Sequence, residues 1–205
     1  MPQPLEAADP EQATALWRVR TASAGELLAR RIDAGSPDQA SDLVAQLRSL
    51  HDLTLYNVET VLGAHEEPDG VWVFLAPVAS STVGRLLASQ EVNVQQRAIL
   101  VLDLLAGLSE LHGAGLGHAR LTERTVIVDI EGRLRLAEPW RLPGEVSDPA
   151  DEVSRAGRLA CWILGVGTRP GGELTVAEQQ APALVAVARS LAAGAESRAT
   201  DAFQG

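Results

Sequence analysis

Residues 111–139, LHGAGLGHARLTERTVIVDIEGRLRLAEP, carry the clearest structural signal in the chain. Gly113 and Gly115 close an apolar helical pattern, because glycine readily adopts the left-handed conformation that ends many helices. The run TVIVDIEGRLRLAE that follows is rich in β-branched and aliphatic residues on both sides of a Glu131-Gly132 step, which predicts a β-hairpin. A helix, a loop and a hairpin are therefore expected in direct succession.

Further elements are expected on both sides of this stretch. Two hairpins are predicted upstream, one turning within TASAGE (residues 21–26) and one turning within HEEPDG (residues 65–70), the latter between β-rich runs at 56–62 and 71–75. Apolar residues at helical spacing predict helices over residues 37–50, 82–89, 94–112, 151–164 and 181–193. The first third is thus β-rich with one helix, and the remainder is helical with one hairpin.

This order of elements predicts an α+β fold in two unequal parts. Residues 1–12 are expected to form a flexible tail, residues 13–78 a small β-rich part, and residues 79–205 a larger, mainly helical part. Within the long helix at 94–112, the predicted core face includes Leu102.

The composition of the 205 residues excludes several classes of function. Acidic residues outnumber basic ones by 27 to 17, and the net charge of −10 argues against binding to nucleic acid or to anionic membrane surfaces. The chain contains no lysine, so a Schiff base and phosphate binding by lysine are excluded. Cys161 is the single cysteine, which rules out an internal disulfide and indicates a reducing compartment. Because no apolar stretch is long enough to span a bilayer, we expect a cytoplasmic location without membrane insertion.

The order of elements and several local phrases resemble a bacterial Ser/Thr protein kinase domain over residues 17–203. Residues 111–139 resemble the kinase catalytic loop with its hairpin and metal-binding motif. Residues 71–87, VWVFLAPVASSTVGRLL, resemble the fifth strand, the hinge and the next helix. DEVSRAG (151–157) resembles the helix behind the catalytic loop, and AAGAESRATDAF (192–203) resembles the C-terminal signature. The resemblance implies a bilobal fold with a β-rich N-lobe, a mainly helical C-lobe and a shortened activation segment.

The sequence departs from the kinase pattern at positions that carry chemistry in that family. Residues 1–16 contain no glycine, so a glycine-rich phosphate loop is missing. Arg31 stands where the resemblance places the phosphate-anchoring lysine, and it is either a substitute phosphate ligand or a solvated strand arginine. The predicted helix at 37–50 has no glutamate to pair with it, and Gln46, near the expected register, offers only a neutral contact.

The catalytic loop and the metal-binding motif depart further. Arg120 replaces the aspartate that acts as the base, and an arginine cannot accept the proton of a substrate hydroxyl. Thr125 replaces the metal-binding asparagine. Glu138, followed by Pro139 and Trp140, stands in place of the Asp-Phe-Gly motif. It is either a magnesium ligand or a salt-bridge carboxylate, and Pro139 is expected to restrict its backbone.

Other positions fit packing roles in the kinase fold. The resemblance assigns structural roles to His118 and Gly157, and an ion pair to Glu145 with Arg198. Six residues separate Glu138 from Glu145, so the activation segment is nearly deleted. The apolar residues that the resemblance places around an adenine ring are Ala29, Leu75, Ala76, Val78 and Ile127. They would either hold a nucleotide base or collapse on one another.

The leading hypothesis is a pseudokinase, a catalytically inactive kinase-like domain that binds or regulates other proteins and has no metal or other cofactor. One alternative is a switch that binds ATP without metal through Arg31 and Arg120. Others are an unorthodox active kinase with Glu138 as its metal ligand, and an α+β interaction domain unrelated to kinases. The lysine-free, alanine- and arginine-rich composition is typical of a GC-rich genome such as that of an actinobacterium, where the resemblance implies cell-envelope signalling. The expected partner is a protein of unidentified kind, not a nucleic acid.

Overall fold

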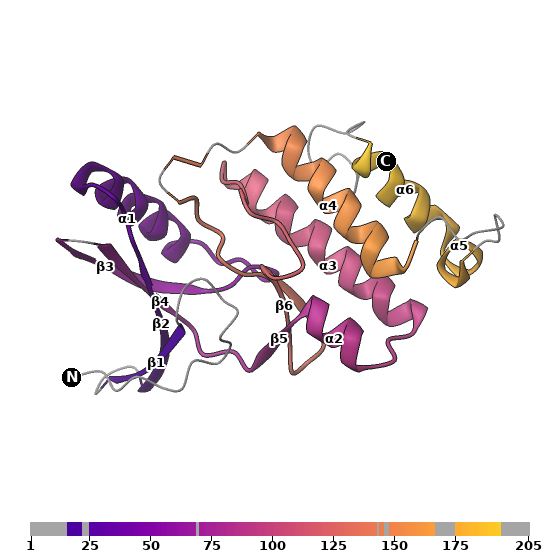
Figure 1. The fold of residues 1–205 in the computed structure, drawn as a ribbon, viewed down its shortest axis with the longest axis horizontal. Helices are drawn as coiled ribbons and strands as arrows, with labels where there is room; N and C mark the ends of the chain where they lie inside the picture. Colours follow the sequence, from indigo (N-terminus) through magenta and orange to yellow (C-terminus); the bar gives the residue numbers. More distant parts are fainter. Residues whose placement is uncertain are drawn as a thin grey trace. The chain divides into compact units, whose positions relative to one another are not determined.

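The computed structural model describes residues 16–21, 25–68, 70–142, 144–145, 148–166 and 175–193 (Figure 1). Over these ranges it combines a small antiparallel sheet carrying one helix with a mainly helical region. The predicted α+β class is confirmed, and the arrangement is compatible with a bilobal kinase-like fold. The tail predicted at residues 1–12 lies outside the described residues.

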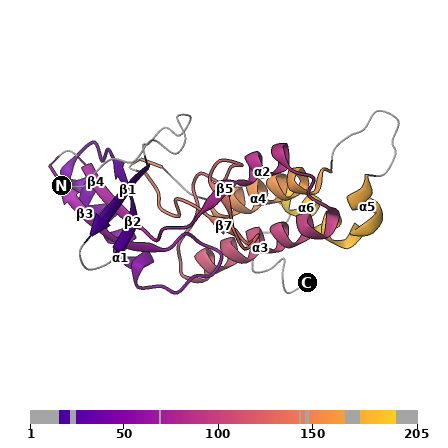
Figure 2. The same ribbon diagram turned by 90° about the horizontal axis from the view of Figure 1, so that it is seen from below.

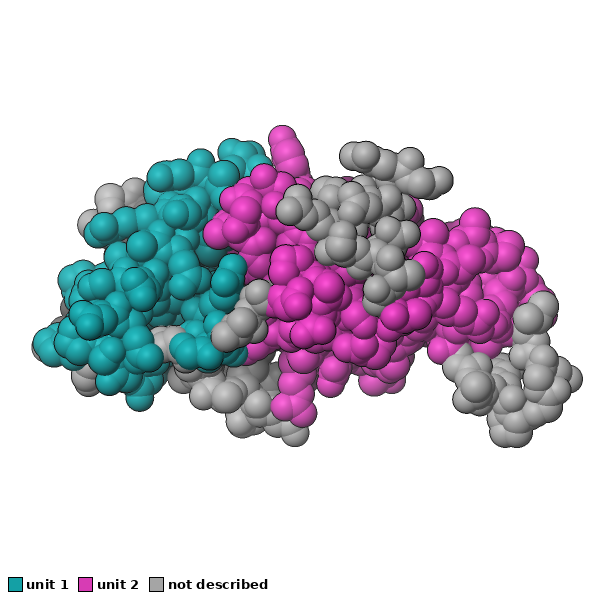
Figure 3. Space-filling model, turned by 90° about the horizontal axis from the view of Figure 1, so that it is seen from above, with its two compact units in different colours: residues 1–54, 59–78, 140–145 teal, residues 55–58, 79–139, 146–205 magenta. Residues whose placement is uncertain are grey.

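The chain divides into two compact units, which are coloured separately in Figure 3. Unit 1 comprises Met1–Thr54, Glu59–Val78 and Trp140–Glu145, and unit 2 comprises Leu55–Val58, Ala79–Pro139 and Val146–Gly205. One boundary falls at the position given for the end of the predicted N-lobe, after Val78. Two short segments, 55–58 and 140–145, do not belong to the unit that surrounds them in the sequence.

Unit 1 is built on a four-stranded antiparallel sheet in the order β1-β2-β4-β3. Its strands are β1 (Leu16–Thr21), β2 (Gly25–Ile32), β3 (Val61–Glu67) and β4 (Gly70–Leu75). Val71, Val73 and Leu75 alternate along β4 and are fully buried, as expected where one face of a strand lies in the core. The two strand pairs predicted in this part of the chain are confirmed.

One helix, α1 (Pro37–His51), packs against β3 and β4. Ser36 caps its first turn, because the Ser36 hydroxyl accepts a hydrogen bond from the amide of Gln39 at 3.4 Å. The leucines of its apolar face are all buried: Leu43, Leu47 and Leu50. Burying such a side chain is worth about 1.5–3 kcal/mol, so this face holds the helix on the sheet.

The β-rich run predicted at residues 56–62 forms a strand only from Val61 onward. Its first residues bend and join unit 2 instead. Asn57 is buried there, and its side-chain amide donates to the carbonyl of Leu134 at 3.1 Å. Its own carbonyl accepts a hydrogen bond from the amide of Leu136 at 2.8 Å. These bonds fix the backbone in a bend and exclude the continuous strand.

The described part of unit 2 contains five helices and a small antiparallel sheet (Figure 2). The helices are α2 (Val83–Ser89), α3 (Val94–Gly113), α4 (Pro149–Leu164), α5 (Val176–Gln180) and α6 (Pro182–Ala192). The sheet has the order β5-β6-β7, with β5 (Ser80–Thr82), β6 (Val126–Asp129) and β7 (Leu134–Leu136). The hairpin of β6 and β7 is the one predicted, and Gly132 at its turn has a φ of 79°.

Two elements of unit 2 are not among those predicted. β5 has three residues and pairs with β6, and Thr82 at its end also caps α2 by accepting a hydrogen bond from the amide of Arg85 at 3.2 Å. α5 has five residues and carries a capping box between Thr175 and Glu178. Neither is long enough to show a hydrophobic period in the sequence.

Helix α3 supplies much of the core of unit 2, through Leu100, Val101, Leu104, Leu105, Leu108 and Leu111. Leu102, predicted on the core face, is 45% exposed. The buried face is centred near Leu104 instead, and a residue two positions away points about 200° from that centre. Although α3 has 20 residues, no helix in the described part of the chain is long and apolar enough to cross a membrane.

Candidate functional site

Two residues predicted from the kinase resemblance form an ion pair in unit 2. Arg120 lies in the loop between α3 and β6, and Glu138 lies just after β7. The Arg120 Nη2 atom is 2.9 Å from the Glu138 Oε2 atom, and the two side chains are 29% and 16% exposed. Water screens a pair sheltered to this degree less than it screens a surface pair. The positive charge of Arg120 is therefore matched by the carboxylate of Glu138.

Glu138 also has an unusual backbone. Its φ of 56° lies in the left-handed region, and it is the one non-glycine residue with positive φ in the described part of the chain. Pro139 was expected to restrict this residue, but the restriction favours extended conformations and does not account for this one. A residue held there costs about 1–3 kcal/mol, and the ion pair with Arg120 offsets part of that cost.

Thr125, which the resemblance assigns to the position of the kinase asparagine, bonds within its own loop. Its hydroxyl donates to the carbonyl of Arg120 at 2.5 Å and accepts a hydrogen bond from the amide of Thr122 at 2.9 Å. A hydroxyl has one donor and two acceptor positions, so these bonds use most of its capacity. The side chain holds the loop that carries Arg120 and offers little to a cation.

His118 is fully buried beside the same loop. Its Nε2 lies 2.8 Å from the carbonyl oxygen of Ala137, which requires the ring to carry a proton on Nε2. Burial lowers the pKa of His118 below its ordinary value of 6.5, so the ring is neutral near neutral pH. Because Ala137 directly precedes Glu138, this bond and the ion pair hold the same end of β7.

In unit 1, the residues predicted at the lysine and glutamate positions do not form an ion pair with each other. Arg31 on β2 has its Nε atom 4.0 Å from the Oε2 atom of Glu67 on β3, and both side chains are more than one-third exposed. Gln46 on α1 instead accepts a hydrogen bond from the amide of Arg141 at 3.2 Å. The helix thus provides a neutral contact to segment 140–145.

The five residues predicted around an adenine ring fall in both units. Ala29, Leu75, Ala76 and Val78 belong to unit 1, and Ile127 belongs to unit 2. Ala29 and Leu75 have no exposed surface and lie on the paired strands β2 and β4. Both are part of the core of their unit. A nucleotide site at these residues stays a prediction.

The residues predicted to have structural roles differ in how far the structure describes them. Glu145 accepts a hydrogen bond from the amide of Leu142 at 2.7 Å, while Arg198 lies outside the described residues, so their ion pair stays a prediction. Gly157 on α4 touches α6, because a Cβ atom there would lie 2.1 Å from the amide nitrogen of Ala192. Glycine at this position lets the two helices meet backbone to backbone.

Neither a metal centre nor an activated cysteine emerges from the described residues. No group of three or more His, Cys, Asp or Glu side chains gathers there in a way that would hold a metal ion. Cys161 on α4 is partly buried, and burial raises the pKa of its thiol, which is the opposite of what a nucleophile needs.

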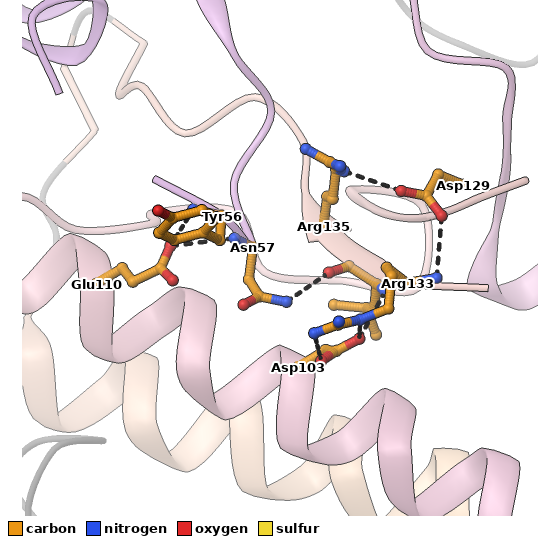
Figure 4. Close-up of polar contacts among 8 residues, drawn as sticks. Tyr56, Asn57, Asp103, Glu110, Asp129, Arg133 and Arg135 are labelled. Carbon is orange, nitrogen blue, oxygen red and sulfur yellow. Dashed lines mark hydrogen bonds and ion pairs between the residues drawn. The ribbon is translucent and has the colours of Figure 1, made fainter. Parts of the chain in front are cut away.

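A buried carboxylate in unit 2 was missed by the sequence reasoning (Figure 4). Asp103 on α3 accepts hydrogen bonds from Arg133 Nε at 2.9 Å, from Arg133 Nη2 at 2.7 Å and from the amide of Leu134 at 3.0 Å. These three bonds tie the hairpin of β6 and β7 to α3. The available signal was Asp103 itself, the one charge within the apolar stretch 98–108.

A second carboxylate of α3 holds the bent segment described above (Figure 4). Glu110 accepts hydrogen bonds from the amides of Tyr56 at 2.9 Å and Asn57 at 3.1 Å. Backbone amides are obligatory donors, so a bend that leaves two of them without a strand partner needs such an acceptor. No local pattern marks Glu110 for this role.

In unit 1 the sequence reasoning missed Arg30 and Glu59. Arg30, next to the predicted site residue Arg31, is only 6% exposed. Burial raises the pKa of Glu59 to about 7, and the positive charge of Arg30 opposes this rise. The small unit thus holds a buried arginine and a partly buried carboxyl whose pKa is close to neutral pH.

Comparison with known proteins places the chain at a distance from characterised ones. No protein-family model matches it. It is 28% identical over 159 residues to guanylate cyclase 2D of Rattus norvegicus, and 29% identical over 112 residues to guanylate cyclase D of Mus musculus. These matches cover 69% and 53% of this chain, which spans only 14% and 10% of the length of the cyclases. They support a kinase-like domain and nothing finer.

Proposed function

We propose that the chain is a catalytically inactive protein-kinase-like domain that works by binding and regulating other proteins. The observation that carries this proposal is the ion pair between Arg120 and Glu138. Phosphoryl transfer needs a group that accepts the proton of the attacking hydroxyl, and carboxylates that hold magnesium. Here a cation occupies the first position, and the carboxylate at the second position is paired with that cation.

Using Glu138 as a metal ligand would be unfavourable. If Glu138 bound a metal ion, Arg120 would lose the negative charge that now compensates it. This loss is costly because both side chains are largely sheltered from water. Metal binding would also place the guanidinium close to a divalent cation of the same sign. Thr125, whose hydroxyl is bonded within its loop, offers no compensating ligand.

The residues of unit 1 support the same function. Arg31 lies near the carboxylate of Glu67, and Gln46 on α1 is neutral. Active kinases organise phosphate binding with a lysine–glutamate pair, and α1 carries no glutamate that would form such a pair with Arg31. We propose no cofactor for this domain.

The distant similarity to guanylate cyclases supports a regulatory domain. Because the chain spans only 14% and 10% of those proteins, we do not extend cyclase activity to it. We propose that its partners are proteins. A cytoplasmic location and a role in cell-envelope signalling stay predictions.

A thermal-shift titration with ATP and ADP, each with and without magnesium or manganese, tests this function. A site filled at about a hundredfold its Kd would add ~2.7 kcal/mol to the free energy of unfolding, which raises Tm by roughly 5–10 °C. We expect no nucleotide to move Tm by more than about 1 °C. A metal-dependent shift that Glu138→Gln abolishes would overturn the proposal, provided that the exposed control Glu131→Gln keeps it.

The second candidate function is the metal-independent nucleotide switch, and the exposure of Arg31 favours it. Its side chain as a whole is 37% exposed, which leaves room for a phosphate to approach it. A shift that needs no metal and is lost in Arg31→Ala would support this function. Arg20→Ala, which changes an arginine that is 81% exposed, is the matched control and should leave such a shift unchanged.

A further inference from the structure

Unit 2 has a groove of about 710 Å³ beside its small sheet. The C-terminal end of α2, the first turns of α3, strand β5 and the turn between β6 and β7 line it. Sites that bind ligands in proteins span about 300–1,000 Å³, so this groove has the size of a binding site. None of the candidate site residues assigned from the kinase resemblance lines it, and neither Arg120 nor Glu138 does.

Two large aliphatic side chains of this lining are open to water. Ile130, at the turn of the hairpin, is 83% exposed, and Ile99 on α3 is 49% exposed. Turns are normally built from small polar residues, so an isoleucine is unusual here, and at 83% exposure it buries little apolar surface in the fold. Leu86 and Val92 extend the apolar lining. The groove therefore offers aliphatic surface that the described part of unit 2 does not bury.

Charges around the groove are predominantly negative. Glu91, in the loop before α3, and Glu131, at the hairpin turn, both line it and are exposed. The arginine of the lining, Arg133, is bound by Asp103 through two hydrogen bonds of 2.9 and 2.7 Å, so its charge is compensated (Figure 4). An occupant with positive charge would complement this rim.

One wall of the groove is an edge strand. β5 pairs with β6 on one side, and no other described strand pairs with its outer edge. An edge strand can hydrogen-bond to an added extended segment. Alternate side chains of such a segment point the same way, so two residues that flank a third would reach the groove together.

We propose that this groove binds an extended segment of a partner protein, in which two aliphatic side chains at alternate positions lie next to arginines or lysines. The aliphatic side chains contact Ile99 and Ile130, and the cationic ones contact Glu91 and Glu131. The inference rests on the proposed protein-binding function and names a surface for it.

Fluorescence anisotropy with short labelled peptides and the full chain tests this inference. The first peptide carries two arginines followed by two leucines at alternate positions. The second has glutamates in place of the arginines, and the third has serines in place of the leucines. We expect the first peptide to bind at least about tenfold more tightly than the other two, because only it matches both the apolar lining and the acidic rim.

Variants of two exposed residues locate the binding. Ile130→Asp should weaken the first peptide by about tenfold without disturbing the fold, because this side chain is 83% exposed. Glu131→Arg should weaken the first peptide and strengthen the glutamate peptide, since it reverses one charge of the rim. Val176→Asp is the matched control, because Val176 is an apolar side chain of the same unit that is 51% exposed and does not line the groove.

Three results would each overturn the inference: equal binding of the arginine and glutamate peptides, equal weakening by Val176→Asp, or no binding of any peptide at about 1 mM. The proposed function fails differently. Metal-dependent phosphate incorporation from ATP would contradict catalytic inactivity and leave the peptide result standing, so the two failures are distinguishable.

Discussion

At the residue scale, the main feature is a reversal of charge at one of two positions, which lets the two side chains pair. Arg120 and Glu138 stand where the kinase resemblance expects aspartates, and their side chains are 2.9 Å apart. Glu138 adopts a left-handed backbone at this place, and Thr125 and His118 hold the segments that carry the pair. The groups that would do chemistry in a kinase thus serve the packing of unit 2.

The pair of Arg120 and Glu138 should contribute measurably to stability. In a double-mutant cycle with Arg120→Ala and Glu138→Gln, we expect a coupling of about 1–2 kcal/mol in the free energy of unfolding, because both side chains are sheltered. Urea unfolding measures it. The pair of Arg20 and Glu26 is the matched control: it is 2.7 Å apart but exposed, so its coupling should be much smaller. If the two pairs had coupling energies of similar size, burial would not be what strengthens the pair of Arg120 and Glu138.

Glu59 should make stability fall as pH rises. Its pKa is raised by burial from 4.5 to about 7, so between these values the folded state keeps a proton that the unfolded state releases. Glu59→Gln should remove this slope and be more stable than the wild type at about pH 8, by up to about 3 kcal/mol.

Comparing each variant with the wild type in urea at about pH 5 and pH 8 tests the role of Glu59. The comparison separates Glu59 from His118, whose lowered pKa makes stability rise with pH up to about 6.5. Glu66→Gln, at an exposed position of β3, is the control. If the stability of Glu59→Gln fell with pH as steeply as that of the wild type, the Glu59 carboxyl would not be the cause of the pH dependence.

At the element scale, the sequence predicted long elements held by local patterns and missed short elements and those held by distant residues. α1, α3 and α4 have clear periodicity and were predicted, whereas β5 and α5 are too short to show one. The run at 56–62 has strand-like composition, but Asn57 bonds to Leu134, which lies 77 positions away in the sequence. Such a partner is invisible to a local pattern.

The same distinction applies to the candidate site. Arg120, Thr125 and Glu138 were singled out by the kinase resemblance, which for these residues is carried by the single stretch 111–139. The pairing of Arg120 with Glu138 brings together two loops, and the groove beside β5 is formed by two stretches that are separate in the sequence, 79–100 and 128–133. Both depend on tertiary contacts that composition and periodicity do not encode.

The contact between α4 and α6 should tolerate no side chain at Gly157. Gly157→Ala would place a Cβ atom 2.1 Å from the amide nitrogen of Ala192, so the helices must separate, and we expect a loss of about 2–4 kcal/mol in the free energy of unfolding. Gly113→Ala is the matched control, because a Cβ atom at this end of α3 meets nothing within 4 Å. Thermal unfolding of both variants measures the difference, and equal Tm values would contradict close helix packing.

At the scale of the whole molecule, the chain combines a kinase-like order of elements with candidate site residues that bond within the two units. Unit 1 has a neutral Gln46 on α1 that bonds to its own segment 140–145, and unit 2 has the closed pair of Arg120 and Glu138. What remains accessible in the described part of unit 2 includes an apolar groove with an acidic rim. Candidate site residues that bond to one another, beside a groove that is open to water, agree with the proposed protein-binding function.

The measurement that tests catalytic inactivity most directly is phosphate incorporation from labelled ATP. The full chain is incubated alone and with general protein substrates, in magnesium and in manganese, beside Glu138→Gln and the exposed control Glu131→Gln. We predict incorporation at background for all three proteins, because Arg120 cannot act as a base and Glu138 is paired with it. Metal-dependent incorporation by the wild type and by Glu131→Gln, abolished in Glu138→Gln, would contradict the account.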